Sequence, residues 1–425
     1  MTDSGVSTPN HCTAFKKNVG STIPSCISLS SKPPSPLKMA EVHGSSDPAF
    51  DSVRDILQQR IADGREIGAA ICVNIDGKNV LDIWGGYADP AKTKPWEENT
   101  ITCVWSCTKV VTALAAVILL DRGLLDINAP VAKYWPEFGA NGKENIKVWH
   151  VLSHSSGIPS WEPPIDQETA FDTKKSTELL AQAGPPWWTP GEHPGYHLLN
   201  QGHMVGEIVR RISGKSLTQF IADEIATPLG ADFRLGVDEQ DWPRTAEMLP
   251  PPPLQLQGLD PKSIIARAFF GFRAPADITN TPGWRGSEFG AANGYSNARA
   301  LARIGSIVAR GGVVDGKRYL SPEAIDQMIQ ERVSGPDLVL GHQIRFGLGV
   351  GRPVLETLPY IPEGQICYWS GWGGSMFIMD LERKMTIGYV MNKMGQGTVG
   401  NENSGAYVEE IFKIADSLRQ STSSL

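Results

Sequence analysis

The sequence is poor in features that would place it on a membrane or on nucleic acid. Its longest strongly apolar stretch, VVTALAAVILL at residues 110–120, is about half as long as a transmembrane helix needs to be. The formal net charge is −7 and no block rich in lysine and arginine occurs, which argues against nucleic acid or an anionic membrane as a partner. No Gly-x-Ser-x-Gly occurs, so the nucleophile turn typical of α/β-hydrolases is absent.

Cysteine is also scarce, and the six residues are scattered without paired spacing. This usage is typical of free thiols in a reducing compartment and not of a disulfide framework, so we expect a cytoplasmic protein. Cys107 stands next to a candidate nucleophile, Ser106, and is a rival for that role. A cysteine nucleophile needs a histidine partner, however, and no nearby pattern supplies one. We interpret Cys107 as a small packed residue.

Composition divides the 425 residues into a tail and a folded remainder. Residues 1–45 are rich in Ser, Thr and Pro and lack both apolar periodicity and a secretory signal, so we predict a disordered N-terminal extension. We assign residues 46–130 and 295–425 to the two parts of an α/β domain, and residues 131–294 to a helical domain with active-site loops. Strands at both ends with helices between predict an α+β fold: one antiparallel sheet built from both termini and flanked by helices, with a mostly helical domain inserted.

Local patterns place individual elements within this plan. Asp47 and Pro48, followed by apolar residues at helical spacing, predict a helix over residues 47–64. Asp76-Gly77 separates two β-prone runs and predicts a hairpin. A buried helix is expected over residues 106–121. Near the end of the chain, four β-like runs precede a terminal helix.

Ser106 and Lys109 stand where a β-prone run meets the apolar helix. Residues three apart share one face at a helix start, and the unpaired backbone N–H groups there favour negative charge. A serine hydroxyl becomes a strong nucleophile when a base takes its proton, and lysine can be that base if burial lowers its pKa from about 10.4 towards neutrality. A second Ser-x-x-Lys, Ser35 to Lys38, lies in the proline-rich tail, which cannot hold two side chains in register.

A serine–lysine pair needs a third group that carries a proton to the leaving group, and tyrosine suits this role. Two tyrosines are candidates from their surroundings. Tyr196 lies in WWTPGEHPGYHLLNQGH, and Tyr295 lies in AANGYSNARALARIG, where it forms a literal Tyr-x-Asn. The residues themselves leave the choice between them open.

Several segments together resemble the serine β-lactamase-like superfamily. VWSCTKVVTALAAVILLDRGLLDINAPVAKYWPEF followed by VWHVLSHSSGIPSW is similar to the branch of class C β-lactamases, family VIII esterases and transesterases. In that branch a Trp-x-Pro-Gly stretch leads to a Tyr-His pair before a helix that ends in Arg-Arg-x-x-Gly, as in WTPGEHPGYHLLNQGHMVGEIVRRISG. The resemblance covers residues 47–420 and implies a β-lactamase/transpeptidase-like fold.

The resemblance implies roles for single residues. It makes Ser106 the nucleophile, Lys109 its base and Tyr196 the catalytic tyrosine, and it places Tyr295 before a later structural helix. It matches the family's third motif, a Lys-Thr-Gly on an edge strand, to Trp372-Gly373-Gly374 in WSGWGGSMFIMD.

The resemblance also implies how an oxyanion would be bound. We expect it to accept hydrogen bonds from the backbone N–H of Ser106 and from one near Ser375. Gly373 and Gly374 would let that strand approach the substrate closely. We group His197 with the residues that bind the oxyanion and substrate, and we expect it to pack beside Tyr196 and orient it.

Trp372 is a departure from the family pattern. It stands where lactamases and cell-wall peptidases carry a lysine or histidine that recognises a carboxylate, and a neutral indole offers an apolar wall instead. Neutral esters or thioesters therefore become more plausible substrates than penicillins or peptidoglycan. Four tryptophans in loops near the motifs are candidates for lining an apolar acyl pocket: Trp187, Trp188, Trp284 and Trp372.

The predicted function is that of a serine hydrolase acting through an acyl-enzyme on carboxylic esters or thioesters of small apolar molecules. One alternative is an acyltransferase (transesterase) of secondary metabolism that passes the acyl group to an alcohol, with an acyl carrier as a candidate donor. Another is a non-catalytic scaffold relative. We expect no cofactor and no metal, because the i, i+4 histidine pairs lack the glutamate of a zinc-protease helix.

Overall fold

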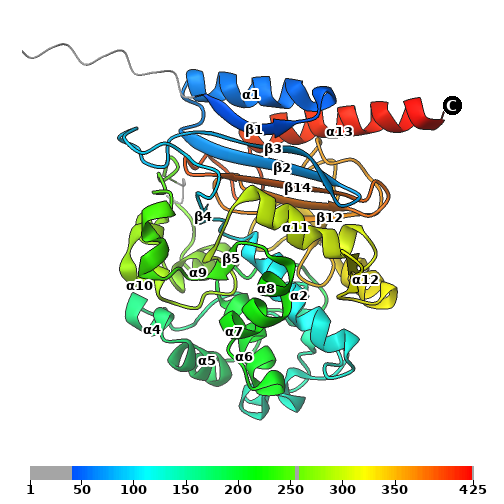
Figure 1. Cartoon of the computed structure of the whole chain (residues 1–425). Coiled ribbons are helices and arrows are strands. Elements are labelled where there is room, and N and C mark those ends of the chain that lie inside the picture. Colours follow the sequence, from blue (N-terminus) through cyan, green and yellow to red (C-terminus); the bar gives the residue numbers. More distant parts are fainter. Residues whose placement is uncertain (1–40, 254–257, 424–425) are drawn as a thin grey trace, which may run out of the picture. The chain divides into compact units, whose positions relative to one another are not determined.

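A nine-stranded antiparallel sheet joins the two ends of the described chain (Figure 1). The computed structural model describes residues 41–253 and 258–423. The last strand of the sequence, β14, pairs along its whole length with β2 in the middle of the sheet. This confirms the predicted α+β fold with one antiparallel sheet assembled from both termini. In sheet order the strands are β1 (Val42–Ser46), β3 (Lys78–Gly86), β2 (Gly68–Ile75), β14 (Met385–Met391), β13 (Met376–Asp380), β12 (Ile366–Ser370), β11 (Gly351–Arg352), β10 (Gln343–Phe346) and β9 (Val333–Pro336).

The hairpin between β2 and β3 forms at the predicted turn. Asp76 has φ 46° and Gly77 has φ 92°, so both residues lie in the left-handed region that a two-residue type I′ turn requires. β2 is buried along nearly its whole length, whereas β3 is exposed at its start and alternates towards its end. The near-continuous apolar run of β2 follows from its central place between two layers of helices.

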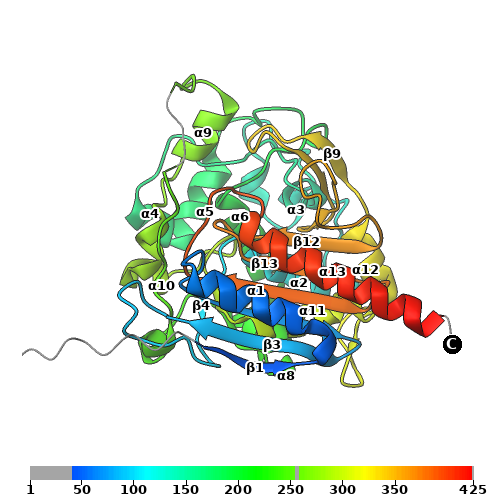
Figure 2. The ribbon, with the colours of Figure 1, turned by 90° about the horizontal axis from the view of Figure 1, so that it is seen from above.

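Helices cover both faces of the sheet (Figures 1 and 2). The first helix, α1 (Asp51–Ala62), and the last, α13 (Glu402–Ser423), lie side by side over one face. Helix α11 (Ala298–Ala309) covers the other face and contacts β2, β13 and β14. The Asp47 side chain caps the start of this first helical segment as predicted, by accepting a hydrogen bond from the backbone N–H of Ala49.

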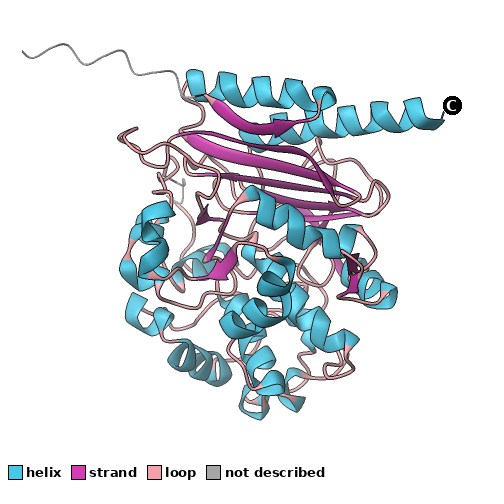
Figure 3. Ribbon diagram, in the orientation of Figure 1, coloured by secondary structure: helices cyan, strands magenta, loops and turns pink. Residues whose placement is uncertain are grey.

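The middle of the sequence is mostly helical and packs around α2 (Thr108–Asp121) (Figure 3). Residues 108–119 of α2 are all buried, against α6, α7, α12 and strand β12. In the described ranges, none of the helices combines the length and the apolar character that a bilayer crossing requires. The other helices are α3 (Val148–Leu152), α4 (Gln167–Phe171), α5 (Thr173–Gln182), α6 (Asn200–Ser213), α7 (Leu217–Ile221), α8 (Thr227–Leu229), α9 (Ile264–Phe270), α10 (Pro282–Arg285) and α12 (Pro322–Ile329).

Two small sheets accompany the large one. A three-stranded antiparallel sheet has the order β4 (Thr102–Cys103), β6 (Gly294–Ser296) and β5 (Phe233–Leu235). A two-stranded sheet pairs β7 (Val313–Val314) with β8 (Lys317–Arg318). The three-stranded sheet matters for function, because β4 leads directly into the Ser-x-x-Lys segment.

The regular structure begins earlier than the sequence indicated. A disordered extension was expected over residues 1–45; residues 1–40 of it lie outside the described residues. Val42–Ser46, however, form strand β1, which pairs with β3 from Val42↔Gly85 to Ser46↔Leu81. The prediction was wrong for residues 42–45 because an edge strand rich in serine and glycine shows no apolar alternation, and backbone hydrogen bonds to β3 stabilise it instead.

Glu66, which lies shortly before β2, is a buried acid. Its side chain is fully buried, and its Oε1 accepts hydrogen bonds from Tyr389 at 2.5 Å and Tyr407 at 3.4 Å. Among the described residues no group bonds to its Oε2. Burial raises the pKa of Glu66 to about 7, although the bond from Tyr389 opposes this rise. The folded state therefore favours the protonated acid.

This burial makes stability depend on pH. In the unfolded chain a glutamic acid ionises with a pKa of about 4.3, so stability is lost progressively as the pH rises from about 4.3 to the folded pKa of about 7. From pH 5 to pH 8.5 the free energy of unfolding should fall by about 2 to 3 kcal/mol through this group. Glu66→Gln keeps an acceptor for Tyr389 and should remove that fall in urea unfolding measured at both pH values.

Glu409→Gln, on the exposed side of α13, is the matched control and should keep the wild-type pH dependence. If Glu66→Gln loses as much stability as the wild type between the two pH values, Glu66 does not ionise in this range.

Candidate active site

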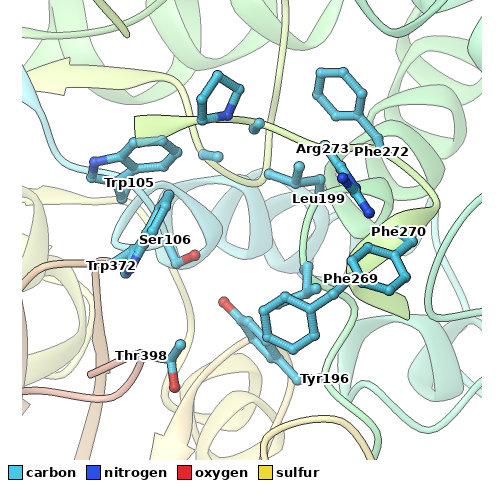
Figure 4. A pocket seen from close by; sticks show the side chains of 14 residues that line it. Trp105, Ser106, Tyr196, Leu199, Phe269, Phe270, Phe272, Arg273, Trp372 and Thr398 are labelled. Carbon is cyan, nitrogen blue, oxygen red and sulfur yellow. The ribbon is translucent and has the colours of Figure 1, made fainter. Parts of the chain in front are cut away.

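Ser106 lies in the turn that connects β4 to α2. The residue before it, Trp105, has φ 47°, a left-handed conformation that a bulky residue rarely adopts. Such strain persists only where the surroundings hold it, and the Trp105 ring contacts those of Trp284 and Trp372, with centroids 5.7 Å and 5.0 Å away. Ser106 lines a cavity of about 690 Å³ (Figure 4). The strained turn thus presents the hydroxyl to open space at the start of a buried helix.

Lys109 is fully buried one turn further along the helix. Its Nζ lies 3.2 Å from the Ser106 Oγ and donates to the carbonyl oxygens of Leu198 at 2.8 Å and Ala291 at 3.0 Å. Burial lowers the pKa of Lys109 well below its usual value. A neutral amine has two N–H groups and one lone pair. Because the two carbonyls accept both N–H groups, the lone pair faces the Ser106 hydroxyl and can accept its proton.

Tyr196 completes the cluster from the loop before α6. Lys109 Nζ lies 4.7 Å from the centre of its ring, and the hydroxyls of Tyr196 and Ser106 point into the same space in Figure 4. The Trp369 indole donates to the Tyr196 hydroxyl oxygen at 2.8 Å. An indole N–H can only donate, so the phenol proton is directed towards Ser106. Burial raises the pKa of Tyr196, which keeps the phenol protonated. The arrangement therefore suits Tyr196 to donate a proton and Lys109 to accept one.

A buried layer behind Tyr196 holds it in place. The Asp337 Oδ1 accepts a hydrogen bond from the backbone N–H of Tyr196 at 3.0 Å. The His197 Nδ1 lies 2.6 Å from the Gly195 carbonyl oxygen, and its Nε2 lies 2.6 Å from the Ser156 Oγ. Burial lowers the pKa of His197 to about 3, so the ring is neutral.

His197 is not among the described residues that line the cavity, and both of its ring nitrogens are engaged elsewhere. The expectation that it binds substrate or the oxyanion is corrected accordingly. The structure places it as a buried supporting residue next to Tyr196.

The Trp372-Gly373-Gly374 motif lies in the turn between β12 and β13. The turn is closed by hydrogen bonds from Gly371 to Ser375 at 2.8 Å and from Gly374 to Gly371 at 3.0 Å. These are inner strands, since β11 lies beyond β12, so the expected edge strand is corrected. Among the described residues, neither the backbone N–H of Ser106 nor that of Ser375 has a hydrogen-bond acceptor. Both are available for an oxyanion.

The two glycines of this turn are required by its backbone conformation and by its packing. Gly373 has φ 91° and Gly374 has φ 127°, a backbone that side chains rarely allow. A Cβ atom on Gly373 would lie 2.6 Å from the Met394 side chain, and one on Gly374 would overlap the Asn401 amide. The glycines permit close packing against the segment that follows β14, and the expected approach to substrate stays a prediction.

The cavity wall is mainly apolar, and most of it comes from places the sequence did not point to. Of the four tryptophans expected there, Trp372 lines the cavity, whereas Trp284 is buried behind Trp105 and the other two lie elsewhere. The lining residues are Trp105, Ser106, Tyr196, Leu198, Leu199, Phe269, Phe270, Phe272, Arg273, Ala274, Pro275, Ala292, Trp372 and Thr398. The aromatic cluster AFFGF at residues 268–272 was a usable signal in a segment interpreted as a loop.

The two rival residues are placed away from the cavity. Cys107 is fully buried, its Sγ lies 3.7 Å from the Trp369 carbonyl oxygen, and burial raises the pKa of its thiol. The Tyr295 hydroxyl donates to the Thr279 carbonyl oxygen at 2.7 Å. The structure therefore brings Ser106, Lys109 and Tyr196 together and leaves these two side chains outside the group.

This chain is similar to known proteins over both the sheet and the site. The sequence model of the family described as Beta-lactamase matches residues 53–409. Esterase/beta-lactamase LipL of Mycobacterium tuberculosis is 33% identical over 380 residues, which cover 86% of this chain and 86% of LipL. The structure of a family VIII carboxylesterase has a TM-score of 0.82 at 34% identity, covering 88% of this chain and 100% of that one. A penicillin-binding protein homologue from Caulobacter crescentus has a TM-score of 0.82 at 33% identity, with the same coverage.

Replacing Lys109 by arginine tests the assignment of the base. Arginine stays protonated in a protein where the buried lysine is neutral, so Ser106 would lose its proton acceptor. We expect labelling of Ser106 by a fluorophosphonate, followed by intact-protein mass spectrometry, to slow by about 10²- to 10⁴-fold. Lys174→Arg on the exposed side of α5 is the control and should label at the wild-type rate. Equal labelling of Lys109→Arg and wild type would mean that another group takes the proton.

Proposed function

The chain belongs to the Beta-lactamase family, and from this premise we propose that it is a serine esterase that forms an acyl-enzyme on carboxylic esters or thioesters. The single observation that supports this most is the state of Lys109. It is a buried amine with a lowered pKa, and two carbonyls accept its N–H groups while its Nζ lies 3.2 Å from the Ser106 Oγ. The printed names of LipL and of the family VIII carboxylesterase agree with ester hydrolysis.

In the first half of the reaction, Lys109 takes the proton of Ser106 as the Oγ attacks the carbonyl carbon. The carbonyl electron pair moves onto oxygen, and the resulting oxyanion accepts hydrogen bonds from the backbone N–H groups of Ser106 and Ser375. The Tyr196 phenol then protonates the leaving oxygen or sulfur as its bond to carbon breaks. The Lys109 ammonium returns a proton to Tyr196, so the alcohol or thiol leaves with the proton that Ser106 lost.

In the second half, water takes the place of the departed alcohol. Lys109, neutral again, accepts a proton from that water through Tyr196, and the hydroxide attacks the acyl carbon. Collapse of the second oxyanion breaks the bond to the Ser106 Oγ, which recovers its proton. No lining residue of the cavity among those described carries a carboxylate, so the lysine and the tyrosine serve both halves.

The cavity wall supports substrates whose acyl part is apolar. Trp105 and Trp372 flank Ser106, and Phe269 with Phe270 faces them across the space in Figure 4. Such a wall gains free energy by removing apolar surface from water, at roughly 25 cal/mol per Å². Because a neutral indole stands at Trp372, a penicillin carboxylate would find no cation at that position.

Two variants separate the nucleophile from the proton donor. With p-nitrophenyl esters of two to eight carbons, wild type should form an acyl adduct visible by intact-protein mass spectrometry, and Ser106→Ala should form none. Tyr196→Phe keeps the ring but lacks the phenol proton, and kcat should fall by about 10²-fold or more. An adduct on Ser106→Ala would instead identify another nucleophile, and wild type without adduct or turnover would contradict the esterase proposal.

Acyl transfer to an alcohol is a second candidate, because a cavity of about 690 Å³ has room for an acceptor beside a short acyl chain. In this case 1-butanol should divert the acyl-enzyme: p-nitrophenol release should rise while free acid falls, and butyl ester should appear by gas chromatography. Trp372→Ala, which removes a wall, should lower the ratio of butyl ester to acid. If butanol yields no ester at any concentration that leaves the protein folded, water alone is the acceptor.

A further inference from the structure

We propose that Arg273 determines substrate specificity by binding an anionic group, a carboxylate or a phosphate, at the end of the substrate remote from the reacting carbonyl. The inference rests on the proposed esterase function and adds the substrate class to it. Arg273 follows α9 and lines the same cavity as Ser106. In Figure 4 its guanidinium extends beside Phe270, on the side of the cavity opposite Trp105 and Trp372.

Arg273 differs from the other arginines in its lack of polar partners. Within residues 41–253 and 258–418, each other arginine forms a hydrogen bond or an ion pair; even those without a carboxylate partner bond to backbone carbonyls. Arg273 has neither. Its guanidinium carbon lies 4.2 Å from the centre of the Phe270 ring, and Asp277, four residues on, forms no ion pair with it. Among the described residues none accepts from its five N–H donors, so they are available to a ligand.

A solvent-exposed arginine ordinarily needs no partner, because water accepts its hydrogen bonds. The position of Arg273 changes this once a ligand enters. Arg273 contacts the Phe270 ring and shares the cavity wall with Phe269 and Phe272, so a ligand that fills the cavity displaces water that the guanidinium uses. A wholly apolar ligand cannot replace those hydrogen bonds, and leaving them unmade is costly. A carboxylate or phosphate replaces them with two parallel, charge-assisted bonds.

The other lining residues leave this role to Arg273. None of the remaining described residues of the cavity wall carries a formal charge. The nearby Lys109 is buried, and its N–H groups are taken by the Leu198 and Ala291 carbonyls. The cavity thus has an apolar zone at Ser106 and one fixed cation elsewhere on its wall. That arrangement fits an ester or thioester with an apolar segment next to the carbonyl and an anion at its far end.

Matched substrate pairs that differ by one anionic group test this. The first pair is p-nitrophenyl hexanoate and p-nitrophenyl hemiadipate, which have acyl chains of equal length, with spontaneous hydrolysis subtracted. The second is S-butyryl pantetheine and S-butyryl 4′-phosphopantetheine. In wild type, the ratio of kcat/KM for the anionic member to that for the neutral member should exceed the ratio in Arg273→Gln by about tenfold or more, mainly through KM. The pair that responds identifies the anion as carboxylate or phosphate.

Two further variants sharpen the test. Arg267→Gln removes an arginine of α9 that pairs with Glu162 and does not line the cavity, so it should keep the wild-type ratio. Arg273→Lys keeps the charge without the planar fork and should retain part of the ratio. Raising the ionic strength should shrink the wild-type ratio, because an exposed charge pair is screened by salt.

The outcomes distinguish this proposal from the esterase proposal. If wild type turns over p-nitrophenyl hexanoate and Arg273→Gln shows the wild-type ratio for both pairs, the role of Arg273 is refuted and the esterase stands. If wild type turns over neither member of either pair, the esterase proposal fails and the Arg273 proposal fails with it.

Discussion

The site depends on the exclusion of one amine from water. An isolated ammonium in a protein interior carries a desolvation penalty of several kcal/mol, which no carboxylate near Lys109 offsets. The neutral form is thus favoured, and the carbonyls of Leu198 and Ala291 fix its orientation. Those carbonyls come from the loop before α6 and the segment before β6, about 90 and 180 residues away along the chain. The buried surroundings of Lys109 exist only because the mostly helical middle of the chain closes over α2.

A second constraint determines which of Lys109 and Tyr196 is suited to accept a proton and which to donate one. Tyr196 and Lys109 face the same serine, and either could in principle accept its proton. Burial acts on them in opposite directions, because it disfavours the charged form of each: it lowers the pKa of the amine and raises that of the phenol. The N–H of Trp369 then takes one lone pair of the phenol oxygen and leaves its proton for Ser106. The same exclusion from water therefore favours the neutral amine of Lys109, which suits a base, and the neutral phenol of Tyr196, which suits an acid.

The reacting groups and most of the cavity wall come from different segments, so the scaffold can accept different substrates with the same reacting groups. The reacting groups sit on α2, on the loop before α6 and on the turn after β12, all anchored by the sheet or by the core of the helical region. The walls come largely from α9 and the residues after it, which include Phe269, Phe270 and Arg273. Because this segment touches neither the base nor the proton donor by any hydrogen bond, its side chains can vary without disturbing the chemistry.

The sequence by itself determined the antiparallel sheet assembled from both termini, the Asp76-Gly77 hairpin, and the pairing of Ser106 with Lys109. These features rest on local rules: turn residues that accept positive φ, apolar periodicity, and the common face of residues three apart. Residue spacing alone could not choose Tyr196 over Tyr295; the family resemblance made that choice, and the fold buries Tyr295 against Thr279. Strand β1, the donor Trp369 and the phenylalanine wall needed the tertiary structure. Each depends on a partner distant in sequence, and long-range contacts of this kind leave no periodic or spacing signal to read.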